Sequence, residues 1–96
     1  MVAAHEGYVA ECFWPDVEDA DLAALDRRIE GVLVQSGRAV RYLGSLLLRD
    51  DEVVLCRFEG AADHVREVAE RAAVPFDRLL AVAHSPWPIS ALGGTE

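Results

Sequence analysis

The segment from Gly44 to Phe58 constrains the fold more than any other part of this chain. It reads Gly-Ser-Leu-Leu-Leu-Arg-Asp-Asp-Glu-Val-Val-Leu-Cys-Arg-Phe, which is two apolar arms around an acidic turn. Apolar runs on both sides of a short polar stretch predict a β-hairpin. Because apolar residues occupy both alternating positions of each arm, both faces of this hairpin need a covering.

The segments around the hairpin predict two more strands and two helices. Pro15 ends a first short aromatic strand, Asp16 is placed to cap the first helix, and Gly37 ends that helix. Pro75 prevents the second helix from continuing. The expected strands cover residues 8–14, 40–48, 53–59 and 79–84, and the expected helices cover about 16–36 and 62–73.

Both helices carry one apolar stripe at 3- and 4-residue spacing, which is typical of a helix that packs on one side. The stripes are Leu22, Leu25, Ile29, Val32 and Leu33 in the first helix, and Val65, Val68, Ala69 and Ala72 in the second. The resulting order β-α-β-β-α-β predicts an α+β fold, the ferredoxin-like sandwich. In that fold both helices cover one face of a four-stranded antiparallel sheet. We expect one domain over residues 8–84, a flexible arm over 1–7 and an extended tail over 85–96.

The hairpin admits two registers, which differ in the faces that their side chains occupy. A two-residue turn at Asp50-Asp51 pairs Leu48 with Val53, whereas a three-residue loop pairs Leu48 with Val54. A shift of one residue exchanges the faces of one strand relative to the other. The three-residue loop separates charged from apolar residues better, so we prefer it. It places Arg41, Leu43, Ser45 and Leu47 on one face with Val53, Leu55, Arg57 and Glu59.

The charge and composition exclude several classes of partner. A net charge of −8 argues against nucleic acid, which is bound through basic surfaces. No apolar run reaches the roughly 20 residues that span a bilayer, and the first residues do not resemble a signal peptide. Cys12 and Cys56 are expected to be buried free thiols. A cytoplasmic protein that binds neither nucleic acid nor membrane is the expectation.

The sheet face that turns away from the helices keeps several apolar residues in either register. An exposed apolar patch of this kind usually marks an interaction surface, and the simplest covering is a second copy of the same sheet. We therefore expect a homodimer through the sheet face, which encloses a mostly apolar space and has room for a small ligand. The candidate ligand-binding residues are Glu11, Phe13, Arg41, Leu43, Ser45, Leu55, Arg57 and Glu59.

Three short stretches carry a resemblance to a known family. They read Val-Leu-Cys-Arg-Phe-Glu-Gly over 54–60, Val-Arg-Glu-Val-Ala-Glu-Arg-Ala over 65–72, and Pro-Phe-Asp-Arg-Leu-Leu over 75–80. The chain resembles a family of short bacterial ferredoxin-like proteins, mostly of unknown function, some of them described as nickel-binding. The resemblance implies the ferredoxin-like fold and a dimer. The family's metal histidines fall where this chain has Phe13 or Trp14, Ala69 and Val74, none of which can bind a metal.

The remaining candidates for chemistry are few. Among the histidines, His5, His64 and His84, no two have the i,i+4 spacing of a helical metal site, so we expect surface histidines, no metal site and no cofactor. Glu11 and Arg57 lie on strands that are neighbours in this fold, as an interface ion pair or as a general base beside a substrate-orienting arginine. We favour a non-enzymatic binding module that takes a small ligand or a protein partner. The alternatives are a cofactor-free enzyme, similar to dimeric monooxygenases or cyclases, and a binder of nickel or another divalent metal.

Overall fold

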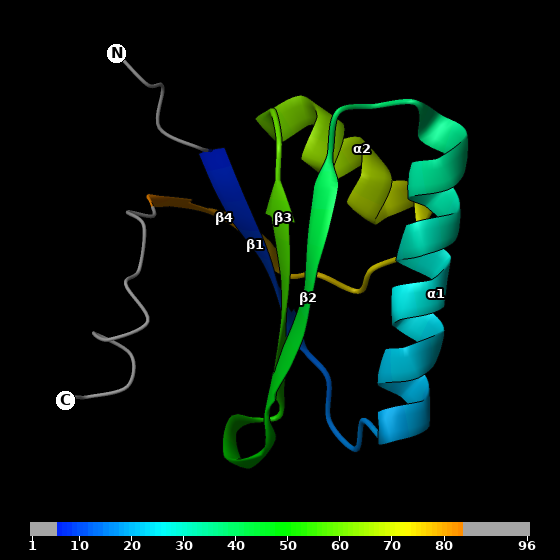
Figure 1. Cartoon of the computed structure of the whole chain (residues 1–96). Helices are drawn as coiled ribbons and strands as arrows, with labels where there is room; N and C mark the ends of the chain where they lie inside the picture. The colour runs from blue at the N-terminus through cyan, green and yellow to red at the C-terminus, as the bar shows by residue number, and fades with distance from the viewer. Residues whose placement is uncertain (1–5, 84–96) are drawn as a thin grey trace, which may run out of the picture.

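The computed structural model of the chain describes residues 6–83, which form one antiparallel sheet and two helices (Figure 1). The strands lie in the spatial order β2-β3-β1-β4. In chain order the elements are β1 (Glu6–Phe13), α1 (Asp19–Ser36), β2 (Arg41–Leu48), β3 (Val53–Glu59), α2 (Ala62–Arg71) and β4 (Arg78–Ala83), with a short 3₁₀ turn (Arg49–Asp51) between β2 and β3.

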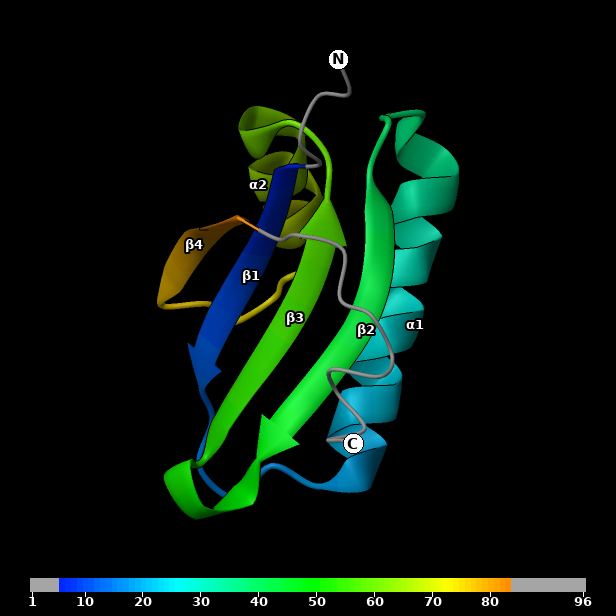
Figure 2. The ribbon, with the colours of Figure 1, turned by 60° about the vertical axis from the view of Figure 1, so that its left-hand side comes forward.

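Both helices lie against the same face of the sheet, and the other face is turned away from them (Figure 2). The element order, the strand order and this one-sided arrangement make the fold ferredoxin-like, as the sequence predicts. No helix within residues 6–83 is long and apolar enough to cross a membrane. Glu6 and Gly7, expected in the arm, instead begin β1. Residues 1–5 of the arm, the expected end of the last strand at His84 and the whole expected tail lie outside the described residues.

The beginning of α1 differs from the prediction. Glu18, not Asp16, is the N-cap residue, and its backbone N–H donates to the carboxylate of Asp21 at 2.9 Å. Asp16 has φ +62°, a left-handed conformation that a turn requires and a cap does not. The helix ends as expected at Gly37, which has φ +68°.

The core fills the space between the helices and the covered face of the sheet. The stripe of α2 is buried, and in α1 Leu25 and Ile29 are buried while Leu22, Val32 and Leu33 pack at the margin. From the sheet, the core receives Ala10, Cys12, Val54, Cys56 and Phe58. The Tyr42 ring packs on Phe58 with 5.2 Å between ring centroids. This apolar burial on one side fixes which face of each strand turns inward.

The two helices are also tied to each other by polar contacts. Arg28 of α1 donates from Nε to the carbonyl of Ala72 at 2.9 Å and from Nη2 to the carbonyl of Ala73 at 3.2 Å. Carbonyls that follow the last turn of a helix have no helical partner, so a cation there is favourable. This contact holds α2 at a fixed place on the sheet.

The preferred register of the hairpin is wrong. The structure pairs Leu48 with Val53 and Leu46 with Leu55, which is the other register considered. The faces are sorted instead by a β-bulge between Tyr42 and Gly44, where Leu43 is the extra residue. Gly44 has φ +106°, a conformation that favours glycine.

The bulge explains why neither uninterrupted register describes the whole hairpin. On the loop side of the bulge, Ser45 and Leu47 pair with Cys56 and Val54 and therefore face the helices. On its other side Tyr42 pairs with Phe58 and also faces the helices. The residues left for the opposite face of β2 are Arg41, Gly44, Leu46 and Leu48.

Candidate functional site

The face of the sheet turned away from the helices is called the open face (Figure 2). It is built from four rows of residues that lie opposite one another across the strands. Residues directly opposite in an antiparallel ladder share a face. From the hairpin end, the rows are Leu48–Val53–Phe13, Leu46–Leu55–Glu11–Arg78, Gly44–Arg57–Val9–Leu80 and Arg41–Glu59–Gly7–Val82. These rows define the surface available to a partner.

Apolar and charged side chains divide the open face into four corners. The leucine corner lies at the hairpin end, mainly on β2 and β3, and contains Leu46, Leu48, Val53, Leu55 and Phe13. The valine corner lies diagonally opposite on β1 and β4 and contains Val9, Leu80 and Val82. The arginine corner contains Arg41, Arg57 and Glu59, and the fourth, the Glu11–Arg78 corner, contains those two residues. The two apolar corners therefore lie on one diagonal of the face, and the two corners with charged residues lie on the other.

The apolar corners are accessible to solvent. Phe13 is 59% exposed, Leu46 53% and Leu48 38% in the leucine corner. Phe13 sits at the end of β1, where its backbone N–H donates to the Asp77 carboxylate at 2.7 Å. This hydrogen bond fixes the backbone from which the exposed ring projects.

Glu11 forms its ion pair with Arg78 and not with Arg57. The Arg78 guanidinium contacts Oε1 of Glu11 from Nη2 at 2.7 Å and from Nε at 2.8 Å. Arg78 lies directly opposite Glu11 on β4, whereas Arg57 lies diagonally from it on β3. The hypothesis of a Glu11–Arg57 pair within one chain is therefore wrong, and the carboxylate is not available as an unpaired base.

The arginine corner contains a second ion pair and one arginine outside it. Arg41 contacts the Glu59 carboxylate at 3.2 Å, and these two residues lie directly opposite each other in the ladder. Arg57 is exposed and forms no ion pair with any carboxylate in residues 6–83. The face therefore has a positive charge near its centre that its own described residues do not neutralise.

Six of the eight candidate residues lie on the open face: Glu11, Phe13, Arg41, Leu55, Arg57 and Glu59. Ser45 turns toward the helices, so its expected place on the face is wrong, and Leu43 is the extra residue of the bulge. Sequence reasoning missed Leu46, Leu48, Arg78, Leu80 and Val82. Gly44 was the available signal for the bulge, because an isolated glycine inside a strand pattern suggests one.

A small pocket lies beside the hairpin, away from the centre of the open face. It has a volume of about 120 Å³ and is lined by Trp14, Asp16, Val17, Leu47, Arg49 and Glu52. The Asp16 N–H donates to the Glu52 carboxylate at 3.4 Å across its rim. Sites for small organic ligands usually enclose about 300–1,000 Å³, so this pocket is too small for such a ligand.

The two cysteines are not nucleophile candidates. Both are free and fully buried on the covered face, as the sequence predicts. The hydrogen bond of Cys12 with Cys56, together with burial, raises the pKa of the Cys12 thiol far above its usual range. A thiol kept neutral in an apolar interior is poorly reactive.

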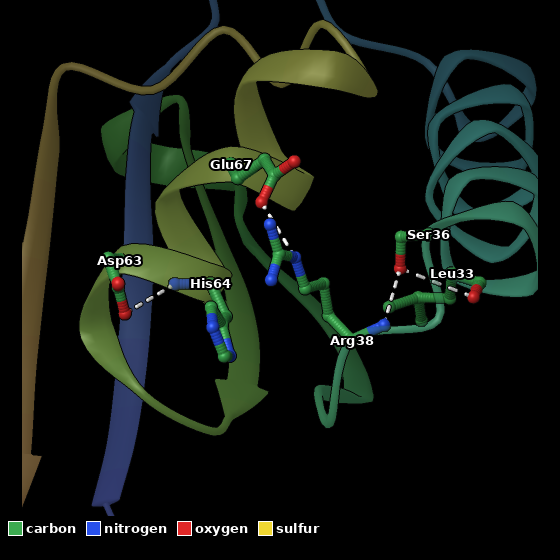
Figure 3. Close-up of polar contacts among 6 residues, drawn as sticks. All are labelled: Leu33, Ser36, Arg38, Asp63, His64 and Glu67. Atoms are coloured by element: carbon green, nitrogen blue, oxygen red, sulfur yellow. Dashed lines mark hydrogen bonds and ion pairs between the residues drawn. The ribbon is translucent and has the colours of Figure 1, made fainter.

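His64, the histidine within the described residues, lies in the first turn of α2 (Figure 3). Its backbone N–H donates to the Asp63 carboxylate at 3.0 Å, and the nearby Glu67 carboxylate is paired with Arg38 at 3.0 Å. Among residues 6–83, no group of three histidine, cysteine or acidic side chains is placed to hold a metal ion. His5 and His84 lie outside the described residues.

Comparison with known proteins adds no relative to this picture. No protein-family model matches the sequence, and no curated protein matches it. What the chain does must therefore be inferred from the open face and the chemistry of its side chains.

Proposed function

We propose that the protein is a homodimeric binding module that uses the open face of its sheet to pair with a second copy and to take up a small ligand or a protein partner. The observation that carries the proposal is the pair of exposed apolar corners, which include Phe13, Leu46, Leu48 and Val82 at 37–59% exposure. Contiguous exposed apolar surface of this kind is unfavourable in a monomer and usually marks an interaction site.

The size of the face supports a dimer of modest affinity. Four strands of six to eight residues, at about 4.8 Å between strands and about 3.4 Å per residue, give roughly 500 Å² per subunit. Two such faces bury about 1,000 Å² in total, which is near the lower limit for a specific interface. We therefore expect dimerisation that depends on protein concentration.

The chemistry of the face favours binding over catalysis. The Glu11 carboxylate, the best candidate for a general base, is held by two contacts to Arg78. A base must be within hydrogen-bond reach of substrate in a form that can accept a proton. The two ion pairs instead supply polar points within an apolar surface, which is how ligand sites obtain orientation and specificity.

The setting that fits this proposal is the cytosol. Two free cysteines are buried in the same core. Thiols in this arrangement are typical of a reducing compartment. We also propose kinship with the short bacterial ferredoxin-like proteins, supported by the shared fold and the quoted motifs.

Light scattering coupled to size-exclusion chromatography tests the dimer. At tens of micromolar we expect a dimer for the natural sequence and a monomer for Leu46→Glu, because the new charge lies in the leucine corner. Val34→Glu is the matched control, since Val34 is 85% exposed on α1 and lies outside the open face. A natural sequence that stays monomeric, or equal effects of the two substitutions, would contradict the proposal.

A thermal-shift screen of small molecules and divalent metals tests ligand uptake. A ligand that binds the folded state raises the melting temperature in proportion to ln(1 + [L]/Kd). We expect hits whose shift is lost in Leu46→Glu and kept in Val34→Glu. Hits that ignore both substitutions would place the ligand elsewhere.

A further inference from the structure

The pattern of the four corners restricts how two open faces can meet. In a face-to-face dimer the two-fold axis lies in the plane between the sheets. Viewed perpendicular to the sheets, each residue of one subunit then faces the residue of the partner whose position on the face is the mirror image of its own across that axis. The direction of the axis relative to the strands therefore decides which corners touch.

If the two-fold axis runs parallel or perpendicular to the strands, each apolar corner of one subunit meets a charged corner of the partner. A parallel axis places the leucine corner over the partner's Glu11–Arg78 corner, and a perpendicular axis places it over the partner's arginine corner. Either arrangement buries charged groups against apolar side chains, which is unfavourable unless the charges remain paired and hydrogen-bonded. Both axes are therefore disfavoured.

If the axis runs along a diagonal of the face, apolar corners meet apolar corners and charged corners meet charged corners, because corners of the same kind lie on the same diagonal. An axis through the two charged corners sets the arginine corner on its own copy, so that Arg57 approaches the partner subunit's Arg57. An axis through the two apolar corners sets each apolar corner on its own copy and sets the arginine corner on the Glu11–Arg78 corner. The first arrangement sets two Arg57 guanidinium groups against each other, whereas the second sets Arg57 against an acidic residue of the opposite corner, Glu11.

We infer that the two subunits pack through a two-fold axis that runs obliquely across the strands, from the leucine corner to the valine corner, so that Arg57 pairs with the partner subunit's Glu11. This inference rests on the proposed dimer and names its geometry and the residue that each subunit supplies to the other. The strands of the two sheets then cross at roughly 70°, which is closer to the orthogonal than to the aligned of the two known ways in which sheets pack.

The ladder spacing agrees with this pairing. With about 4.8 Å between strands and about 6.7 Å between alternate residues, reflection across the oblique axis brings Arg57 within about 3 Å, in projection, of the partner subunit's Glu11. Sheets that pack face to face lie about 10 Å apart, a gap that an arginine and a glutamate side chain together can span. The Glu11 carboxylate then lies between two guanidinium groups, one from each subunit.

The test exchanges the two charges between different chains. Arg57→Glu sets acid against acid in its homodimer, and Glu11→Arg sets base against base, so we expect each variant alone to dimerise at least tenfold more weakly than the natural sequence. In a 1:1 mixture, the R57E chain and the E11R chain present opposite charges at both contacts. We expect the mixture to recover dimerisation to within about threefold of the natural sequence.

Arg27→Glu is the matched control, because it makes the same change in net charge on the exposed side of α1. We expect R27E to dimerise normally and not to rescue R57E. Circular dichroism of each variant shows whether it folds.

Crosslinking with a bifunctional thiol reagent about 10 Å long provides a second readout that does not depend on charge, because residues on sheets about 10 Å apart are too distant for a direct disulfide. We expect Arg57→Cys mixed with Glu11→Cys, each carrying a tag of different size, to form a crosslink between unlike chains.

Crosslinking of R57C to itself would overturn the inference in favour of the axis through the charged corners. A dimer that L46E disrupts but that shows neither rescue nor the mixed crosslink would overturn the inference and leave the proposed dimer intact. A natural sequence that is monomeric at tens of micromolar would overturn both.

Discussion

The two faces of this sheet are built from the same strands and have opposite roles. On the covered face, Phe58 is 1% exposed and packs against Tyr42, whereas on the open face Phe13 is 59% exposed. The covered face carries the stability of the single chain, because its apolar surface is removed from water by α1 and α2. The open face has comparable apolar side chains, and its apolar surface can be removed from water only by something outside the described residues.

The same substitution on the two faces should separate these roles. Phe58→Ala is expected to lower the free energy of unfolding by about 3–5 kcal/mol, since it removes a fully buried ring and leaves a cavity. Phe13→Ala is expected to change it by no more than about 0.5 kcal/mol in the monomer, and to weaken the dimer. Urea unfolding at a concentration well below that of dimerisation measures the first effect, and light scattering measures the second. Similar losses of stability for both variants would show that the open face is already covered within the chain.

The covered face also makes the protein sensitive to alkali. The Tyr42 hydroxyl donates to the Asp26 carboxylate at 2.5 Å, and burial together with this bond raises the pKa of Tyr42 above its usual range. A group that must stay protonated in the folded state stabilises it fully below its unfolded pKa and loses that contribution as the pH rises. The unfolded value is about 10 for tyrosine, so stability should fall above pH 10 through Tyr42.

One substitution tests this step. Tyr42→Phe should cost about 1 kcal/mol at neutral pH and remove the fall above pH 10. Urea unfolding from pH 7 to 11 gives the profile, and an unchanged profile in Tyr42→Phe would contradict the role assigned to that hydroxyl.

The covered face was the more predictable of the two. Apolar spacing in the helices gave the correct stripes, because a helix that packs on one side repeats its buried residues regularly. Strand alternation identified Val54, Cys56 and Phe58 as one face for the same reason. The order of elements then left one topology, which the structure has.

The open face was less predictable because two local events break the regular pattern. A four-residue connection over 49–52 and the bulge at Leu43 together change the face of β2 twice, so that simple alternation misplaced Ser45 and Leu46. The ion pair of Glu11 was missed because Arg78 is the first residue of β4, one position before the expected start of that strand. The bulge adds one residue to β2, and the start of β4 differs from the expected start by one residue. On a sheet, a difference of one residue moves a side chain to the opposite face.

The smallest difference between the two sides of the molecule should be in their ion pairs. Arg78→Gln on the open face and Arg38→Gln on the helix side each remove one surface pair, Glu11–Arg78 and Arg38–Glu67. Exposed pairs contribute about 0.2–1 kcal/mol, so in the monomer both substitutions should cost little and about equally. In 1 M salt, where the screening length is about 3 Å, both costs should shrink further.

At concentrations where the natural sequence dimerises, only Arg78→Gln should have an added effect, because only Glu11 lies in the proposed interface. Urea unfolding at two protein concentrations measures this, and an added effect of Arg38→Gln on the dimer would contradict the assignment of the interface to the open face.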